Sequence, residues 1–302
     1  MDRTPRPTRG ALARRVAAAT AAAVALCAAQ CALRAGRTES RRVDIGGLRL
    51  HVVARGEGAP VVVLDAGLGG TSDSWSEVAP AVAEFTRVVA YDRAGLGRSG
   101  AGPLPRTSGR IVEELKALLD RAGLPAPYVL VGHSFGGMNV RLFASRWPES
   151  VAGIVLVEAT HEDFPSREAL LRSSFDRRRV QNLVLLEREA VRQEFEAFDR
   201  SAEELRQAKS LPRVPIVVLS AGRFEGSPAV QRLWLDFQDD FVGRYVGAVQ
   251  RIAATSGHNV PADEPEAIVG AIREVVEAVR AGRDRVSAGP GPEPAPPAPG
   301  LP

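Results

Sequence analysis

A serine and a histidine have the setting in this 302-residue chain that best supports chemistry. Ser134 is the central residue of a Gly-x-Ser-x-Gly pattern from Gly132 to Gly136, which follows an apolar run and opens a helical one. A tight turn between strand and helix exposes the serine hydroxyl, and the N–H groups at the start of the helix favour an anion. The pattern therefore predicts that Ser134 is a nucleophile.

A serine hydroxyl needs a neighbouring base to take its proton, and the chain contains four histidines. His258 lies in a Gly-containing loop before the last helical stretch, in the order nucleophile, acid, histidine that suits a serine on such a turn. His133 is next to Ser134 and should point away from it, and His51 lies in an early strand. We therefore predict that His258 is the base.

The third member of such a triad is a carboxylate that orients the histidine and stabilises its charged form. The loop after the strand at 216–219 offers only Glu225, which comes late. The strand at 152–157 is followed directly by Glu158. Burial of an unpaired carboxylate is costly, and pairing with His258 would explain an acid there. We expect Glu158 to be the acid. The alternatives are Glu225, Asp163 and Glu162.

Elements that could position these residues alternate along the body of the chain. Near-continuous apolar strands imply helices on both faces of a mostly parallel sheet, so we expect an α/β fold. The expected strands cover 48–54, 61–64, 87–91, 128–131, 152–157, 216–219 and 249–254. The expected helices cover 75–85, 108–122, 135–146 and 264–280.

One domain is expected over 37–281, with a small helical lid inserted at about 161–212. The insert interrupts the alternation of strands and helices with a charged, helix-periodic segment. Its apolar residues indicate an apolar substrate pocket, although packing within the lid explains them equally well. These residues are Phe164, Leu170, Leu171 and Phe175.

The two ends of the chain differ from the body. Residues 1–36 contain a basic region and then the uncharged run 16–33, which is typical of an export signal or a membrane anchor. Because the run is rich in alanine, a soluble helix in a cytoplasmic protein is the alternative. Residues 282–302 are rich in proline, glycine and alanine and are expected to be a disordered tail.

Charge and cysteine content exclude several kinds of site. The 39 Lys and Arg residues are nearly balanced by 36 Asp and Glu residues, and no basic block stands beside aromatic residues, so we expect no nucleic-acid partner. The only cysteines, Cys27 and Cys31, lie in the N-terminal apolar run, which excludes a cysteine-based metal site in the body. We expect neither a metal nor an organic cofactor.

The body resembles the α/β-hydrolase superfamily over about residues 43–281, in its lid-bearing group of esterase, haloperoxidase-like and peptidase-like members. The stretches that carry the resemblance are 66–70, 91–99, 132–137, 147–158 and 256–259. The resemblance implies the α/β-hydrolase fold and an oxyanion site made by the backbone N–H groups of Leu68 and Phe135. It also implies that the acid usually stands in the loop after the strand at 216–219, or otherwise at the end of the strand at 152–157. Ala66 stands where the family usually has histidine. Asp92 and Arg93 are expected to support the cleft rather than react.

These residues together predict a serine hydrolase that forms an acyl-enzyme. The expected substrates are small carboxylic esters with an apolar acyl or alcohol part. Peptide, lactone or C–C bond hydrolysis on the same triad is one alternative, and a binding protein with negligible turnover is another. Epoxide and haloalkane chemistry is disfavoured, because those relatives have aspartate where Ser134 stands.

Overall fold

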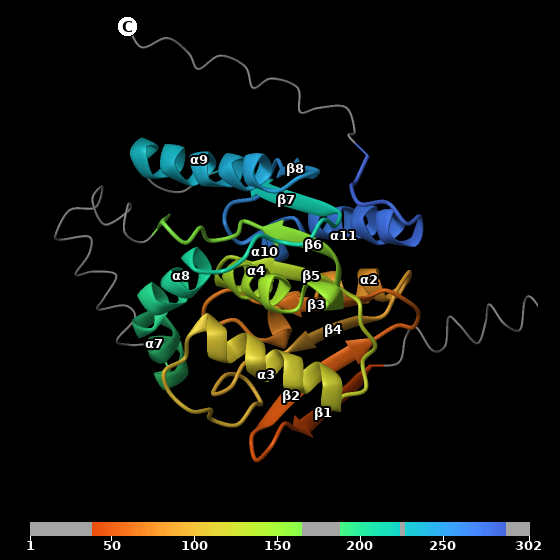
Figure 1. Cartoon of the computed structure of the whole chain (residues 1–302), viewed down its shortest axis with the longest axis vertical. Helices are drawn as coiled ribbons and strands as arrows, with labels where there is room; N and C mark the ends of the chain where they lie inside the picture. Colours follow the sequence, from red (N-terminus) through yellow and green to blue (C-terminus); the bar gives the residue numbers. More distant parts are fainter. Residues whose placement is uncertain (1–37, 165–187, 224–226, 288–302) are drawn as a thin grey trace, which may run out of the picture.

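The computed structural model describes residues 38–164, 188–223 and 227–287. Within them the strands form one eight-stranded sheet in the order β1-β2-β4-β3-β5-β6-β7-β8 (Figure 1). The strands are β1 (Glu39–Asp44), β2 (Arg49–Arg55), β3 (Val61–Asp65), β4 (Val88–Tyr91), β5 (Tyr128–His133), β6 (Val151–Val157), β7 (Ile216–Ala221) and β8 (Ala248–Ala253). β2 pairs antiparallel with β1 and with β4, and the remaining neighbours pair parallel. The predicted α/β fold with a mostly parallel sheet is confirmed.

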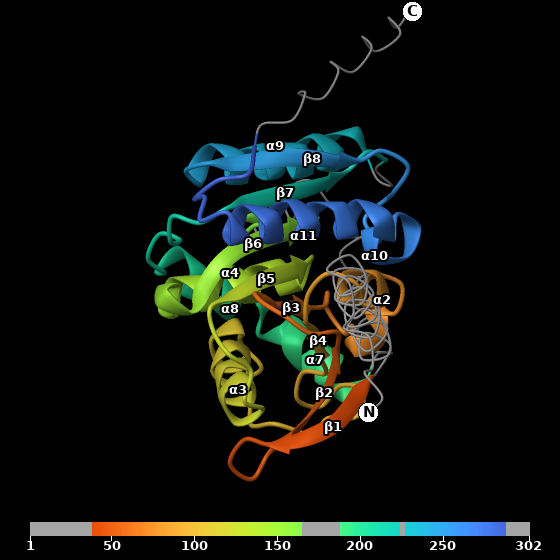
Figure 2. The same ribbon diagram turned by 90° about the vertical axis from the view of Figure 1, so that its right-hand side faces the viewer.

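Helices cover both faces of this sheet, and each interface is an apolar cluster (Figure 2). On one face lie α2 (Val78–Ala83) and α11 (Pro265–Arg280), and on the other lie α3 (Ser108–Arg121) and α4 (Phe135–Arg146). Every residue of β3, β4 and β5 is buried, because each of these strands has helices above and below it. Because β5, β6 and β7 pair parallel, their carboxyl ends meet at one edge of the sheet.

Two short helices of the predicted lid lie between β6 and β7 in the chain. α7 (Glu189–Glu196) and α8 (Phe198–Arg206) fall inside the expected segment 161–212. α8 contacts the N-terminus of α3, where Gly109 N–H donates to Glu204 Oε2 at 2.6 Å and Ser108 N–H donates to Ser201 Oγ at 2.9 Å. The first N–H groups of a helix lack acceptors within the helix, and α8 supplies acceptors for two of these groups in α3.

Some predictions concern residues outside the described ranges. These are Leu170, Leu171 and Phe175 of the lid, the N-terminal segment 1–36 with its run 16–33, and residues 288–302 of the tail. In the part of the chain that the structure describes, no helix has the length and apolarity needed to cross a membrane.

Several elements of the described structure were not expected from the sequence, among them the short 3-10 turn η2 (Pro148–Ser150). β1 is an edge strand with five of its six residues exposed, so it lacks an apolar run. α9 (Pro228–Arg244) packs along β7 and β8, and α10 (Val260–Asp263) is a single turn after His258. The helix expected at 75–85 is instead a 3-10 turn, η1 (Ser72–Trp75), followed by α2.

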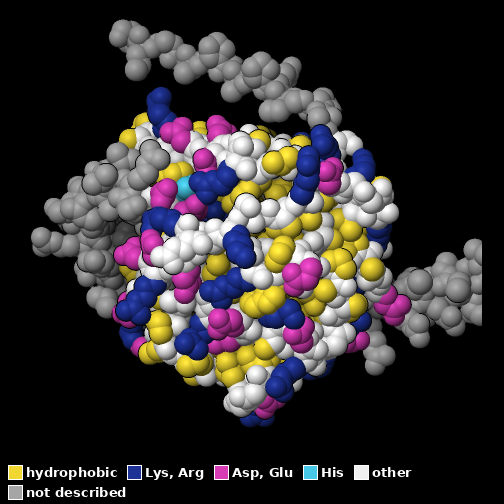
Figure 3. Space-filling view, in the orientation of Figure 1, with side chains coloured by type: hydrophobic (Ala, Val, Ile, Leu, Met, Phe, Trp, Pro, Cys, Tyr) yellow, Lys and Arg dark blue, Asp and Glu magenta, His cyan; other side chains and the backbone are white. Residues whose placement is uncertain are grey.

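Charges are mixed on the molecular surface. On the face drawn in Figure 3, basic and acidic side chains are interspersed, and no broad area carries a single sign. Ion pairs such as Arg98–Asp73 at 2.9 Å and Arg206–Asp163 at 2.9 Å neutralise part of this charge.

Candidate active site

Ser134 occupies a strained turn between β5 and α4. Its backbone has φ 51° and ψ −117°, a region that residues with a side chain rarely adopt. The flanking glycines are required by space, since a Cβ on Gly136 would overlap the Asp65 carbonyl oxygen and a Cβ on Gly132 would overlap the backbone of Gly136. The Gly-x-Ser-x-Gly spacing therefore follows from close packing of β3, β5 and α4 around the partly buried Ser134.

The structure brings Ser134, His258 and Glu158 together. His258 Nε2 lies 3.0 Å from Ser134 Oγ, and His258 Nδ1 lies 3.2 Å from Glu158 Oε2. Glu158, at the end of β6, is 1% exposed, and its Oε1 accepts the Ala221 N–H at 2.7 Å. The carboxylate thus lies between the ends of β6 and β7 with one oxygen directed at the imidazole.

The other carboxylates considered from the sequence have different surroundings. Glu162 forms ion pairs with Arg141 and Arg244, and Asp163 accepts a hydrogen bond from Arg206 at 2.9 Å. Although burial opposes it, the pKa of Glu162 lies well below its usual range because Arg141 stabilises the charged form. Glu225 lies outside the described residues.

The two predicted oxyanion donors belong to the start of α4 and to the loop after β3. Phe135 is the first residue of α4, so its N–H has no acceptor within the helix. The loop that contains Leu68 passes beside Ser134, since a Cβ on Gly67 would stand 3.4 Å from Ser134 Cβ. The Gly67 carbonyl oxygen accepts from Arg93 Nη2 at 2.7 Å, and in a planar trans peptide the Leu68 N–H then points the opposite way.

His133 contacts the backbone of the histidine loop. Its Nε2 lies 2.8 Å from the His258 carbonyl oxygen, which can only accept, so Nε2 carries the proton. Burial, together with the nearby His258, lowers the pKa of His133 to about 3. A neutral His133 therefore holds the His258 backbone. The sequence indicated only that this side chain should point away from Ser134.

The remaining histidines, His51 and His161, have structural surroundings. His161 is stacked on Phe237, with ring centroids 4.1 Å apart, and its Nε2 lies 3.1 Å from Asp240 Oδ2. His51 is buried in β2, where Nδ1 lies 3.0 Å from Asp92 Oδ2 and Nε2 lies 2.8 Å from Ser40 Oγ. Asp92 also accepts the N–H groups of Ser72 and Arg98, which anchors the turn after β4.

α9 supplies an aromatic side to the site that sequence reasoning missed. The Trp234 ring lies edge-to-face against His258, with centroids 5.2 Å apart, and Phe164 lies edge-to-face against Trp234 at 4.7 Å. Gln238, one turn after Trp234, donates to the Ala159 carbonyl at 3.0 Å. The signal was the helical spacing of its buried residues, which are Leu233, Trp234, Phe237, Gln238 and Phe241.

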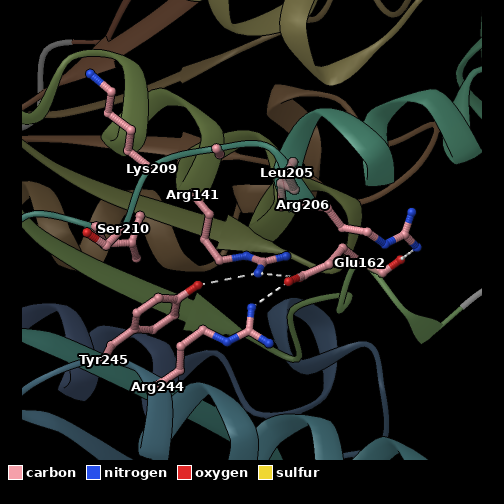
Figure 4. Close-up of a pocket in the computed structure, with 10 residues that line it drawn as sticks. Arg141, Glu162, Leu205, Arg206, Lys209, Ser210, Arg244 and Tyr245 are labelled. Atoms are coloured by element: carbon pink, nitrogen blue, oxygen red, sulfur yellow. Dashed lines mark hydrogen bonds and ion pairs between the residues drawn. The ribbon is translucent and has the colours of Figure 1, made fainter.

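A cavity of about 180 Å³ lies on the α4 flank of the sheet (Figure 4). Glu162 lies between Arg141 and Arg244, and Arg141 also reaches the Tyr245 hydroxyl at 3.4 Å. The described lining includes neither Ser134 nor His258. Since Asp163 and Asp240 pair with the outer arginines, the charges of this cavity are largely compensated. In the described ranges, moreover, no group of three acidic, histidine or cysteine side chains could hold a metal ion.

Comparison with known proteins identifies the family. A family model for the α/β hydrolase fold matches residues 60–253. The uncharacterised protein YqjL of Bacillus subtilis is 28% identical over 235 residues, which are 76% of this chain and 89% of that protein. A putative carbamate hydrolase, RutD of Klebsiella pneumoniae, is 38% identical over 134 residues, so the match covers 41% of this chain and half of that protein (50%).

Solved structures agree with this family. The crystal structure of Cfl2 from Burkholderia cenocepacia has a TM-score of 0.60 and 18% identity, and the match covers 79% of this chain and 96% of that one. At this identity the likeness shows the fold. Because the family model spans more than half of the chain, this protein belongs to the α/β-hydrolase fold family and is a hydrolase of that family.

Proposed function

We propose that the protein is a serine hydrolase that cleaves carboxylic esters through an acyl-enzyme at Ser134. The observation that carries the proposal is the continuous chain of contacts from Ser134 Oγ through the His258 imidazole to Glu158 Oε2, at 3.0 and 3.2 Å. A buried carboxylate opposite Nδ1 favours the tautomer with a proton on Nδ1, which leaves Nε2 free to accept the serine proton.

The reaction follows from this arrangement in two halves. Ser134 Oγ attacks the ester carbonyl carbon while its proton passes to His258 Nε2, and Glu158 stabilises the imidazolium. The tetrahedral intermediate then expels the alcohol, which takes the proton from Nε2. In the second half, His258 takes a proton from water as the water attacks the acyl-enzyme. The second tetrahedral intermediate then collapses and releases the acid, and Ser134 Oγ leaves with the proton from Nε2, which restores the serine hydroxyl.

The oxyanion of each tetrahedral intermediate needs donors already in place. We assign this role to the N–H groups of Leu68 and Phe135, one in the loop beside Ser134 and the other at the start of α4. Removal of one such donor typically lowers kcat about 10²- to 10³-fold. Backbone donors of this kind are fixed by the fold and do not reorganise during the reaction.

The surroundings of His258 favour an ester with an apolar acyl or alcohol part. Trp234, Phe164 and Phe237 form an aromatic cluster at this side of the imidazole. A serine at the nucleophile position supports acyl transfer over epoxide or haloalkane opening. Peptides and lactones react at the same triad in principle, and RutD, a putative carbamate hydrolase, adds carbamates to the substrates to compare.

A fluorophosphonate test checks the proposal. The full chain is treated with the reagent and its intact mass is measured, beside Ser134→Ala and the control Ser210→Ala, which removes an exposed serine. We expect one adduct on the parent and on Ser210→Ala and none on Ser134→Ala. Initial rates on p-nitrophenyl esters of two to eight carbons, an amide, a lactone and a carbamate then rank substrates. Folded parent protein with neither adduct nor turnover would point to a binding protein instead.

A further inference from the structure

Arg93 is a buried side chain in which all five guanidinium N–H donors have acceptors. Nε and Nη2 donate to the two carboxylate oxygens of Glu194 at 2.6 and 2.9 Å. Nη1 donates to Asp65 Oδ1 at 2.9 Å and to the Ala66 carbonyl oxygen at 2.7 Å. The last donor, on Nη2, reaches the Gly67 carbonyl oxygen at 2.7 Å. The planar guanidinium group therefore connects the Glu194 carboxylate to the backbone carbonyls of Ala66 and Gly67.

The second of these carbonyls belongs to the peptide that carries the proposed oxyanion donor. Because a peptide is planar and trans, the Gly67 C=O and the Leu68 N–H point in opposite directions. The Gly67 oxygen also accepts the Gly70 N–H at 2.9 Å, which closes the loop into a tight turn. The direction of the Leu68 N–H is therefore set by what holds the Gly67 oxygen.

Glu194 belongs to α7 of the lid, 101 residues from Arg93 in the chain. It is fully buried, and besides Arg93 it accepts the Gly69 N–H at 3.4 Å. Glu194 thus holds the residues on both sides of Leu68. It acts on the Gly67 carbonyl through Arg93 and accepts the Gly69 N–H directly. Loss of its charge would leave two Arg93 donors without a carboxylate in a site closed to water.

We propose that Glu194 is a positioning residue: through Arg93 and Gly69 it fixes the Gly67–Leu68 peptide, so that docking of α7 completes the oxyanion site. The proposal rests on the proposed serine-hydrolase function. It gives the lid a role in the rate of the chemical step in addition to covering the substrate, because a donor that is preoriented lowers the barrier and one that must reorient does not.

The test compares Glu194→Gln with Glu196→Gln in the full chain. Glu196 is exposed on the same helix, so its substitution changes the charge of α7 equally without touching Arg93. Steady-state rates on p-nitrophenyl butyrate and inhibition by an alkyl trifluoromethyl ketone, whose adduct with serine is an oxyanion, are measured. Since loss of a whole oxyanion donor costs about 10²- to 10³-fold, we expect kcat of Glu194→Gln to fall roughly 10-fold or more. KM should stay within about twofold, the ketone Ki should rise in parallel with the loss of kcat, and Glu196→Gln should match the parent.

Hydrogen exchange of the backbone amides in the segment 66–70 gives a second readout of how firmly this loop is held. Faster exchange in Glu194→Gln than in both the parent and Glu196→Gln supports the positioning role and does not depend on turnover. A folded Glu194→Gln with unchanged kcat and unchanged exchange overturns the proposal, and so does a rise in KM alone. Failure of the parent to react with fluorophosphonate would instead refute the serine-hydrolase function, and exchange would then decide whether Glu194 orders this loop.

Discussion

Glu158→Gln is the substitution that tests the proposed acid most directly. Glutamine has nearly the same shape, and its amide oxygen can still accept the Ala221 N–H that Glu158 Oε1 accepts at 2.7 Å. The amide NH₂ then faces His258 Nδ1 across the 3.2 Å contact. Two donors cannot share one hydrogen bond, so the imidazole changes tautomer, Nε2 keeps the proton, and Ser134 loses its base.

The size of the effect follows from this change of tautomer and the lost charge. Neutralising the acid in a Ser-His-acid triad lowers kcat by about 10⁴-fold, and a loss of 10³- to 10⁴-fold corresponds to roughly 4–5 kcal/mol of barrier. The fold should be little affected, because a neutral amide replaces a buried charge and keeps the bond to Ala221. We expect the free energy of unfolding to change by no more than about 1 kcal/mol.

The assay measures kcat on a p-nitrophenyl ester at pH 8 together with urea unfolding. Asp163→Asn and Glu225→Gln serve as controls, because both acids follow candidate strands in the sequence. We expect the controls to keep kcat within about threefold of the parent, since neither acid is proposed to act in the reaction. The assignment of Glu158 would be refuted if its folded Gln variant lost less than tenfold, or if a control variant lost as much.

Three further predictions concern stability. Burial is the main cause that lowers the pKa of His133 from 6.5 to about 3. As pH falls, the imidazole of the unfolded chain is therefore protonated before that of the folded chain. The free energy of unfolding should decrease between about pH 6.5 and 3, by at most roughly 4–5 kcal/mol. Urea unfolding at pH 7, 5 and 4 should show a smaller decrease for His133→Gln, and equal decreases would contradict the neutral state of His133. A Cβ on Gly136 would overlap the Asp65 oxygen, so Gly136→Ala should lower the Tm and abolish esterase activity. Gly270→Ala, in the middle of α11 with open space around the Cβ, should instead stabilise the fold by about 0.5–1 kcal/mol in thermal melts.

The parallel strands were predictable because their burial leaves a direct trace in the sequence. β3 reads Val-Val-Val-Leu-Asp and is buried at every position. Its apolar run is therefore a direct consequence of its central place in the sheet. β1 leaves no such trace, since it is an edge strand of mostly charged residues with only Val43 buried. An edge strand is specified by the hydrogen bonds of its neighbour, here β2, and these do not depend on its side chains.

α9 and the contact of α7 with Arg93 were missed for different reasons. α9 interleaves its buried aromatic residues with Asp236, Asp239 and Asp240, which hide its period from a simple reading of composition. Glu194 had no distinguishing local signal at all, because its partner is 101 residues away and one glutamate in a charged helical segment resembles an exposed charge. A pairing of this kind becomes visible only when the helix is docked.

The position of the proposed acid has its own physical reason. At the end of β7, where the carboxylate usually stands, a Cβ on Gly222 would come within 2.6 Å of the Ala254 carbonyl oxygen, so the chain after β8 leaves no room for a side chain there. β7 contributes the Ala221 N–H instead, which binds the Glu158 carboxylate that reaches across from β6. The imidazole of His258 requires an oxygen at one point in space, and two neighbouring parallel strands end close enough to supply it. We therefore infer that crowding after β7 favours an acid on β6, and a small-residue turn after β7 is a reason to look for the proposed acid there.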